Sequence, residues 1–175
     1  TFNEVNGIEW FTFQPFTTTP IEGQPQKARI IAIDCEMCET KDPLTGAIDS
    51  KALSRLSVVS GENPEIVLID TLVKPNWPVT DYRTKINGIT EKDLLTCQFT
   101  LRHAQAFMNM ICDENTIVAG HAVHNDLVAL KSNHTRVIDS ALLFKVKGEE
   151  SAPPSLKDLA NQVLKRDMPK THDSV

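Results

Sequence analysis

The sequence lacks an excess of basic residues. Its 18 lysine and arginine residues are outnumbered by 23 aspartate and glutamate residues, which gives a formal net charge of −5. A protein that coats nucleic acid with a broad positive surface is therefore not indicated. A site that holds divalent cations is still compatible with this balance, because a bound metal reverses the local field.

Three other features are missing. The sequence has no apolar run near the roughly eighteen residues that span a bilayer, so we expect no membrane association. Its N-terminal residues do not resemble a secretory signal, and the four cysteines lie in apolar surroundings. We therefore expect a reducing compartment, nuclear or cytoplasmic, and not secretion. A glycine-rich dinucleotide loop is absent, which disfavours an oxidoreductase.

The length and the apolar content indicate one compact domain. The chain has 175 residues, of which 41% are hydrophobic, enough for one sizeable core. Prolines recur in residues 1–27 and interrupt any regular element, so we expect an extended lead-in before a domain at 28–175. Four aromatic side chains are expected to anchor the lead-in: Trp10, Phe11, Phe13 and Phe16.

The first part of the domain is predicted to be a set of antiparallel strands. Residues 29–35 form a nearly continuous apolar run rich in branched side chains, which favours a strand buried on both faces. Strands are also predicted at 52–60 and 65–73, joined by turn residues at 61–64. Because the connection is short, these two strands should pair antiparallel.

The second part is predicted to alternate helices with single strands. Thr90 and Asp93 have the spacing of a capping box that opens a short helix, and Ser155 and Asp158 repeat it. The expected helices lie at 100–113, 125–131, 142–144 and 155–166, and the expected strands at 116–120 and 135–139. The whole order predicts an α/β fold with a mixed sheet: three antiparallel N-terminal strands, then parallel strands, with helices covering the faces.

Two acidic residues follow the first apolar run. Asp34 and Glu36 are two positions apart, so in a strand both side chains point to the same side. Placing two carboxylates at the end of a buried strand is costly unless a positive group compensates, and a hard divalent cation is suitable. By itself this pattern is a weak indication, since acids at strand ends often belong to loops.

A competing interpretation uses the cysteines. Cys35 and Cys38 have the C-x-x-C spacing found in zinc and redox sites. Structural zinc needs four ligands, and no second pair of ligands has suitable spacing. A redox motif would open a helix, whereas these residues follow a strand. We therefore expect buried thiols.

A third acid lies where a predicted strand leads into a helix. Asp126 is in the first turn of that helix, where the helix dipole favours a carboxylate. The same position directs it to the carboxyl edge of the sheet, where ligands of α/β folds bind. His121 and His124 are alternative metal ligands, although loop histidines are more often simply hydrogen-bonded.

Four segments together resemble the DEDDh 3′-to-5′ exonucleases, in particular the RNA exonuclease branch that includes plant small-RNA-degrading nucleases. The Asp-Cys-Glu-Met run at 34–37 resembles the first motif of that branch. Residues 72–75 with 87–90 are similar to the segment that approaches the 3′-terminal nucleotide. Residues 120–126 resemble the second motif and 172–175 the start of the third. The resemblance implies a ribonuclease H-like fold.

The resemblance also implies roles. Asp34, Glu36 and Asp126 would hold two Mg²⁺ or Mn²⁺ ions, and His172 would be the general base. Substrate contacts would come from four further residues: Met37, Asn87, Ile89 and Thr90. Asn87 and Thr90 have an equal alternative, which is to shape a turn and to cap a helix.

One departure from the family pattern concerns the fourth acid. The family has it five residues beyond the histidine, two positions past Val175, so we expect the domain to lack its C-terminal helix. Asp173 resembles an N-cap more than a ligand, and Asp139 is a further candidate for the missing ligand.

The implied reaction is hydrolysis of single-stranded RNA from the 3′ end to nucleoside 5′-monophosphates. The alternatives are a catalytically silent RNA-binding domain and an exonuclease acting on single-stranded DNA. Protein partners are not indicated by the sequence.

Overall fold

A mixed sheet organises the protein. The computed structural model describes residues 2–5, 8–13, 26–144 and 153–168. Its main sheet has the order β5-β4-β3-β7-β8, and β6 pairs with β3 off this path. The strands are β3 (Ile30–Lys41), β4 (Ile48–Ser60), β5 (Val67–Leu72), β6 (Val79–Asp81), β7 (Ile117–Gly120) and β8 (Val137–Asp139). The first three are antiparallel and the last two add in parallel, as predicted.

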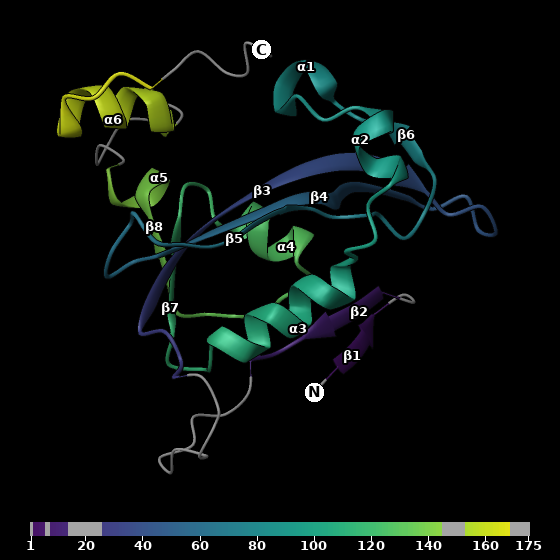
Figure 1. Cartoon of the computed structure of the whole chain (residues 1–175), viewed down its shortest axis with the longest axis horizontal. Coiled ribbons are helices and arrows are strands. Elements are labelled where there is room, and N and C mark those ends of the chain that lie inside the picture. Colours follow the sequence, from purple (N-terminus) through teal and green to yellow (C-terminus); the bar gives the residue numbers. More distant parts are fainter. Residues whose placement is uncertain (1, 6–7, 14–25, 145–152, 169–175) are drawn as a thin grey trace.

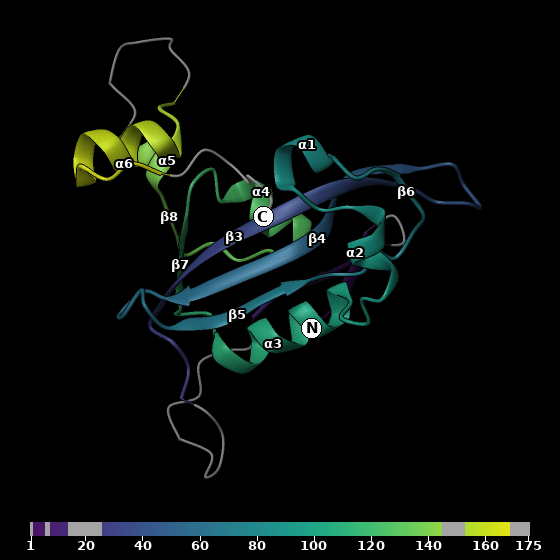
Figure 2. The same ribbon diagram turned by 45° about the horizontal axis from the view of Figure 1, so that its top comes forward.

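Helices lie on either side of this sheet. Figure 1 shows α3 on one side of the long strands, with α1, α5 and α6 towards the other side. After rotation, Figure 2 shows α5 and α6 towards one end of β3 and β4, α1 and α2 towards the other end, and α3 below β5 in this view. The described helices are α1 (Thr84–Asn87), α2 (Glu91–Leu95), α3 (Leu101–Ile111), α4 (His124–Ala129), α5 (Ser140–Leu143) and α6 (Leu156–Leu164).

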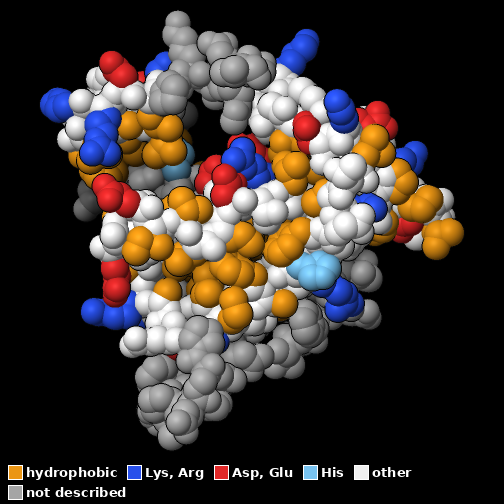
Figure 3. Space-filling view, viewed as in Figure 1, with side chains coloured by type: hydrophobic (Ala, Val, Ile, Leu, Met, Phe, Trp, Pro, Cys, Tyr) orange, Lys and Arg blue, Asp and Glu red, His pale blue; other side chains and the backbone are white. Residues whose placement is uncertain are grey.

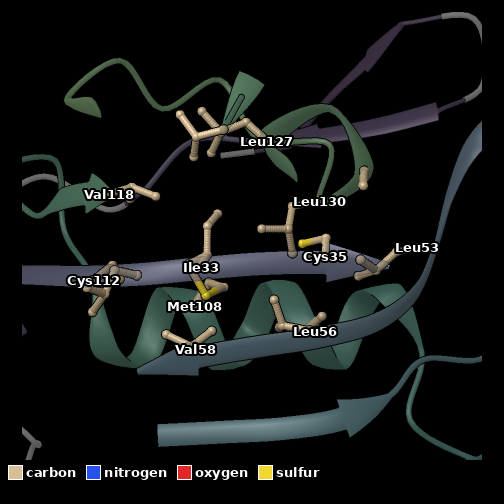
Figure 4. Packing of buried hydrophobic residues seen from close by; sticks show 14 of the residues in the cluster. Ile33, Cys35, Leu53, Leu56, Val58, Met108, Cys112, Val118, Leu127 and Leu130 are labelled. Carbon is tan, nitrogen blue, oxygen red and sulfur yellow. The ribbon is translucent and has the colours of Figure 1, made fainter. Parts of the chain in front are cut away.

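The core lies between the sheet and the helices α3 and α4. Ala104 and Met108, four residues apart on one face of α3, are fully buried. Figure 4 shows how side chains of β3 and β4 meet those of α3 and the α4 segment; among them are Ile33, Cys35, Leu56, Val58, Met108, Leu127 and Leu130. Burial of this one continuous cluster is the main stabilising contribution.

The first strand is longer than predicted, which moves the two acids. β3 continues to Lys41, so Asp34 and Glu36 lie inside the strand and not at its end. Pairing with β7 stops at Ala32, but pairing with β4 runs on to Lys41. This second half is polar because it is a ribbon with one exposed face, and an apolar run does not reveal it.

The N-terminal segment contains a hairpin that the sequence did not predict. β1 (Phe2–Val5) and β2 (Ile8–Phe11) pair antiparallel. Phe11 and Phe13 are buried, as expected, and the ring centroid of Phe13 lies 4.5 Å from that of His134. The Phe11 backbone N–H donates to the Lys131 carbonyl at 2.8 Å. Trp10 is partly buried, and Phe16 falls outside the described residues.

Local predictions about capping and cysteines are confirmed. Thr90 and Asp93 form the capping box of α2, and Ser155 accepts a hydrogen bond from the Asp158 backbone N–H at the start of α6. Cys35 and Cys38 are buried free thiols. In the described ranges, no helix is long and apolar enough to cross a membrane.

Candidate active site

The site is built on a gap along one edge of β3. Strand β7 pairs with this edge only as far as Ala32, and β6 begins to pair with it at Glu39. Between them, side chains replace the missing strand. Asp126 Oδ1 accepts the Cys35 backbone N–H at 2.8 Å, and Asn87 Nδ2 donates to the Met37 carbonyl at 3.3 Å. The gap therefore brings a carboxylate from α4 to the middle of β3.

Asp126 is held in an unfavourable environment for a negative charge. Its side chain lies in the first turn of α4 and the residue is 5% exposed. Burial raises the pKa of Asp126 to about 7; the Cys35 N–H opposes this shift, and the negative charge of Asp34 adds to it. A nearby cation would remove this penalty.

Asp34 and Glu36 lie on either side of Cys35 in β3. Both face away from the apolar core, while Cys35 between them is buried in it. Burial is the main cause that raises the pKa of the Cys35 thiol, followed by the negative charges of Asp126, Asp34 and, more weakly, Glu36. The three acids are therefore neighbours around one residue. Among the described residues, however, no three His, Cys, Asp or Glu side chains are grouped as they stand to hold a metal ion.

A β-bulge lies next to these acids. The pairing of β3 with β4 changes from Glu36 opposite Arg55 to Met37 opposite Leu53, so Ser54 is an extra residue in β4. Bulges re-aim side chains and are frequent beside active sites. No sequence pattern signalled this bulge, because it depends on the register between β3 and β4.

An ion pair on the same face was also missed. Arg55 donates to Asp70 through Nε and Nη2 at 2.8 and 2.7 Å, and Ser57 Oγ donates to Asp70 at 2.8 Å. On the face of the molecule that Figure 3 shows, acidic and basic side chains lie side by side near the middle. The alternation of polar residues in β4 was the available signal.

Asp139 has a structural position. Its carboxylate accepts the backbone N–H groups of Ala122 at 2.8 Å, Val123 at 3.1 Å and Ala141 at 2.9 Å. These bonds hold the turn before α4, in which Ala122 has a left-handed φ of 55°. The geometry thus favours a role in positioning α4 over the role of a fourth metal ligand.

The segment at 87–90 forms a wall of the site. Asn87 is 2% exposed, donates to the Tyr82 carbonyl at 2.9 Å and accepts the Ile89 N–H at 2.9 Å. Ile89 is buried and Thr90 caps α2. Met37 is half-buried on β3. Asn87 and Thr90 therefore have the structural roles that the sequence left open beside substrate contact.

His121 and His124, the alternative metal ligands, have surroundings different from those of the three acids. His121 Nδ1 lies 3.0 Å from the Ser140 hydroxyl, and His124 is exposed at the start of α4. Neither belongs to a metal-holding group within the described part of the chain. His172 and Asp173 fall outside the described residues.

Comparison with known proteins identifies the class. Residues 31–175 match the RNase_T model, described as exonuclease. RNA exonuclease 1 of Saccharomyces cerevisiae is 36% identical over 150 residues, and Small RNA degrading nuclease 2 of Arabidopsis thaliana is 38% identical over 131 residues. These alignments cover 85% and 75% of this chain, respectively, and 26% of each relative.

A solved structure of the Neurospora crassa Pan2 catalytic unit, with protease and nuclease domains, is also similar. It covers 99% of this chain and 28% of its own, with a TM-score of 0.64 and 26% identity. The fold is therefore ribonuclease H-like, and the domain is that of a nuclease. The chain belongs to the RNase_T exonuclease family. It spans about a quarter of the length of the two curated relatives.

Proposed function

We propose that the protein is a metal-dependent 3′-to-5′ exoribonuclease that releases nucleoside 5′-monophosphates from single-stranded RNA. The observation that carries the proposal is the position of Asp126 against the Cys35 backbone N–H, at the gap in the edge of β3, with Asp34 and Glu36 on either side of Cys35. Membership of an exonuclease family supports the interpretation of this cluster as the reaction centre.

The three carboxylates suit Mg²⁺ or Mn²⁺. Hard divalent cations prefer carboxylate oxygens, and a buried acid repelled by its neighbour is a position where a cation is stabilising. Asp126 is already fixed by the Cys35 N–H, whereas Asp34 is exposed on the open face. Rotation of the Asp34 and Glu36 side chains would complete the ligand set. Two bound ions would supply an activated water and stabilise the leaving oxygen.

The chain's other residues would orient the substrate and move the proton. We assign the general base to His172, because an imidazole titrates near neutrality. Met37 and Ile89 would pack against the terminal nucleotide. Asn87 and Thr90 would hold this wall in place, with substrate contact as a second role.

RNA is favoured over DNA by the names of the relatives, which are an RNA exonuclease and a small RNA degrading nuclease. An exonuclease on single-stranded DNA and a silent RNA-binding domain are the two alternatives. A nuclear or cytoplasmic site of action is part of the same proposal.

The test uses single-stranded RNA and DNA of one sequence, labelled at either end, with Mg²⁺, Mn²⁺ or EDTA. We expect 5′-labelled RNA to give a ladder shortened from the 3′ end, and 3′-labelled RNA to release labelled mononucleotide at once. A 3′-phosphate should block both. Asp158→Asn, which removes the carboxylate that accepts the Ser155 hydroxyl hydrogen bond at the start of α6, serves as the matched control for Asp34→Asn. RNA binding without cleavage under every metal condition would favour the silent domain, and cutting of circular RNA would exclude an exonuclease.

A further inference from the structure

Two side chains of β4 hold the short helix that carries Asp126. Asp49 and Lys51 are two positions apart in β4, and both side chains reach the α4 segment. Lys51 Nζ donates to Asn125 Oδ1 at 2.7 Å in the first turn of α4. Asp49 Oδ2 accepts from Lys131 Nζ at 2.7 Å, just after the end of α4. The helix is therefore attached to β4 near both of its ends.

These two contacts differ in burial and in what lies beside them. The side chains of Lys131 and Asp49 are 8% and 17% exposed, so they form an internal ion pair. Removing either partner would leave a charge in the interior, which lowers stability. The bond between Lys51 and Asn125 is only partly buried, but Asn125 directly precedes Asp126 in the chain. The second contact is therefore the one that can act on the proposed metal site.

Asn125 and Asp126 attach the first turn of α4 to two different strands. Asp126 Oδ1 accepts the Cys35 backbone N–H of β3 at 2.8 Å, and Asn125 Oδ1 accepts from Lys51 of β4. Consecutive side chains of a helix point about 100° apart. One hydrogen bond alone would let the turn rotate about it, whereas two bonds in different directions fix both its place and its rotation.

The stability of α4 does not account for the position of this lysine. A cation is favoured at the C-terminal end of a helix and disfavoured at the N-terminal end, yet Lys51 contacts the first turn. We propose that Lys51, through its hydrogen bond to Asn125, positions the Asp126 carboxylate for metal binding. Lys51 and Asn125 are thus positioning residues. The inference rests on the proposed function.

A double-mutant cycle in the full chain tests this, with Mn²⁺ binding measured by calorimetry. Lys51→Met and Asn125→Ala should each weaken Mn²⁺ binding by about tenfold, the usual scale for groups that orient metal ligands. Because both changes remove the same hydrogen bond, the double variant should bind no more weakly than either single variant. Lys41→Met, which removes an exposed lysine from the neighbouring strand β3, should leave the affinity unchanged.

Cleavage kinetics separate positioning from support of the fold. At a fixed low Mn²⁺ concentration, Lys51→Met should lower kcat for RNA by about tenfold, in line with its weaker metal binding, and leave KM for RNA unchanged. Saturating Mn²⁺ should restore most of this loss. Asn125→Ala introduces a residue of high helix propensity, so it keeps the test open if Lys51→Met does not fold.

Additive losses in the double variant would overturn the inference, because the lysine would then act through its charge and not through Asn125. A raised KM for RNA with normal Mn²⁺ affinity would also overturn it and make Lys51 a substrate contact. So would lower thermal midpoints with unchanged Mn²⁺ affinity, which would make the bond a support of the fold only. If Asp126→Asn abolishes Mn²⁺ binding and Lys51→Met leaves it unchanged, this inference fails alone. A wild-type chain without Mn²⁺ binding would overturn the proposed function as well.

Discussion

Two buried aspartates at neighbouring places in the fold have opposite surroundings. Asp139 ends β8 and accepts three backbone N–H groups, from Ala122, Val123 and Ala141. Asp126 accepts the Cys35 backbone N–H and faces the charge of Asp34, and burial raises its pKa to about 7. A carboxylate surrounded by donors stabilises the fold, whereas one held near another carboxylate weakens it. The second arrangement is the one expected at a cation site.

The largest expected effect comes from removing the negative charge of the Asp126 carboxylate. Asp126→Asn should lower RNA hydrolysis by roughly 10³-fold or more, since a charged group that acts in the transition state is lost. Its amide oxygen can still accept the Cys35 N–H, so the fold should persist. Steady-state cleavage of labelled RNA, with circular dichroism as the control for folding, measures both. Activity within tenfold of wild type would remove Asp126 from the reaction centre.

The next largest effect is a change in the free energy of unfolding with pH, measured in the absence of metal. Burial raises the pKa of Asp126 from 3.8 to about 7, so the folded state binds the proton more tightly than the unfolded state does. The stabilisation by the protonated form is complete below about pH 4 and is lost as the pH rises through 7. We expect the metal-free wild type to lose a few kcal/mol relative to Asp126→Asn between pH 5 and 8, on the order of 1.4 kcal/mol per pKa unit.

Urea unfolding of both proteins in EDTA at each pH measures this difference. Parallel curves for wild type and Asp126→Asn would show that the carboxylate carries no such penalty. Added Mn²⁺ should reverse the trend in wild type alone, because a bound cation favours the ionised form.

Asp139→Asn should lower stability more than it lowers activity, the opposite of Asp126→Asn. Asp139→Asn leaves backbone donors of the turn before α4 facing an amide group, which should cost roughly 2 to 4 kcal/mol. Activity per folded molecule should fall far less than in Asp126→Asn. Chemical denaturation measures the free energy of unfolding, and cleavage assays at saturating Mn²⁺ measure the activity per folded molecule. A stable protein with no activity would instead make Asp139 a ligand.

The sequence predicted most of the framework but not the geometry of the site. Period-two and helical spacing located the main strands and helices. The assignment of Asp34, Glu36 and Asp126 as metal ligands stays a prediction, because within the described ranges no three such side chains are grouped to hold a metal ion. The gap in the β3 edge was not predictable, because it depends on where β7 stops pairing with β3. The bulge at Ser54 was not predictable for the same reason: register is a property of two strands and their partners.

The smallest expected effect tests how tightly the turn before α4 is packed. A Cβ atom on Gly120, the last residue of β7, would lie 3.0 Å from Val123 Cγ2 and 3.2 Å from the Ile33 carbonyl oxygen. Both contacts are tight, and Val123 is the residue that precedes α4.

Gly120→Ala should therefore shift the start of α4, and with it Asp126, by a few tenths of an ångström. We expect a loss of about 1 kcal/mol of stability, as for mild overpacking, and a several-fold weaker Mn²⁺ affinity. Truncation of the Val123 side chain removes the contact with Cγ2 but leaves the contact with Val123 Cβ at 3.1 Å, so it should relieve the crowding in part. Val123→Ala combined with Gly120→Ala should regain part of the Mn²⁺ affinity even though Val123→Ala alone leaves a cavity and costs stability. If the double variant binds Mn²⁺ no better than Gly120→Ala, the position of Asp126 is not set by this packing, and the hydrogen bonds of Asp139 alone hold the turn.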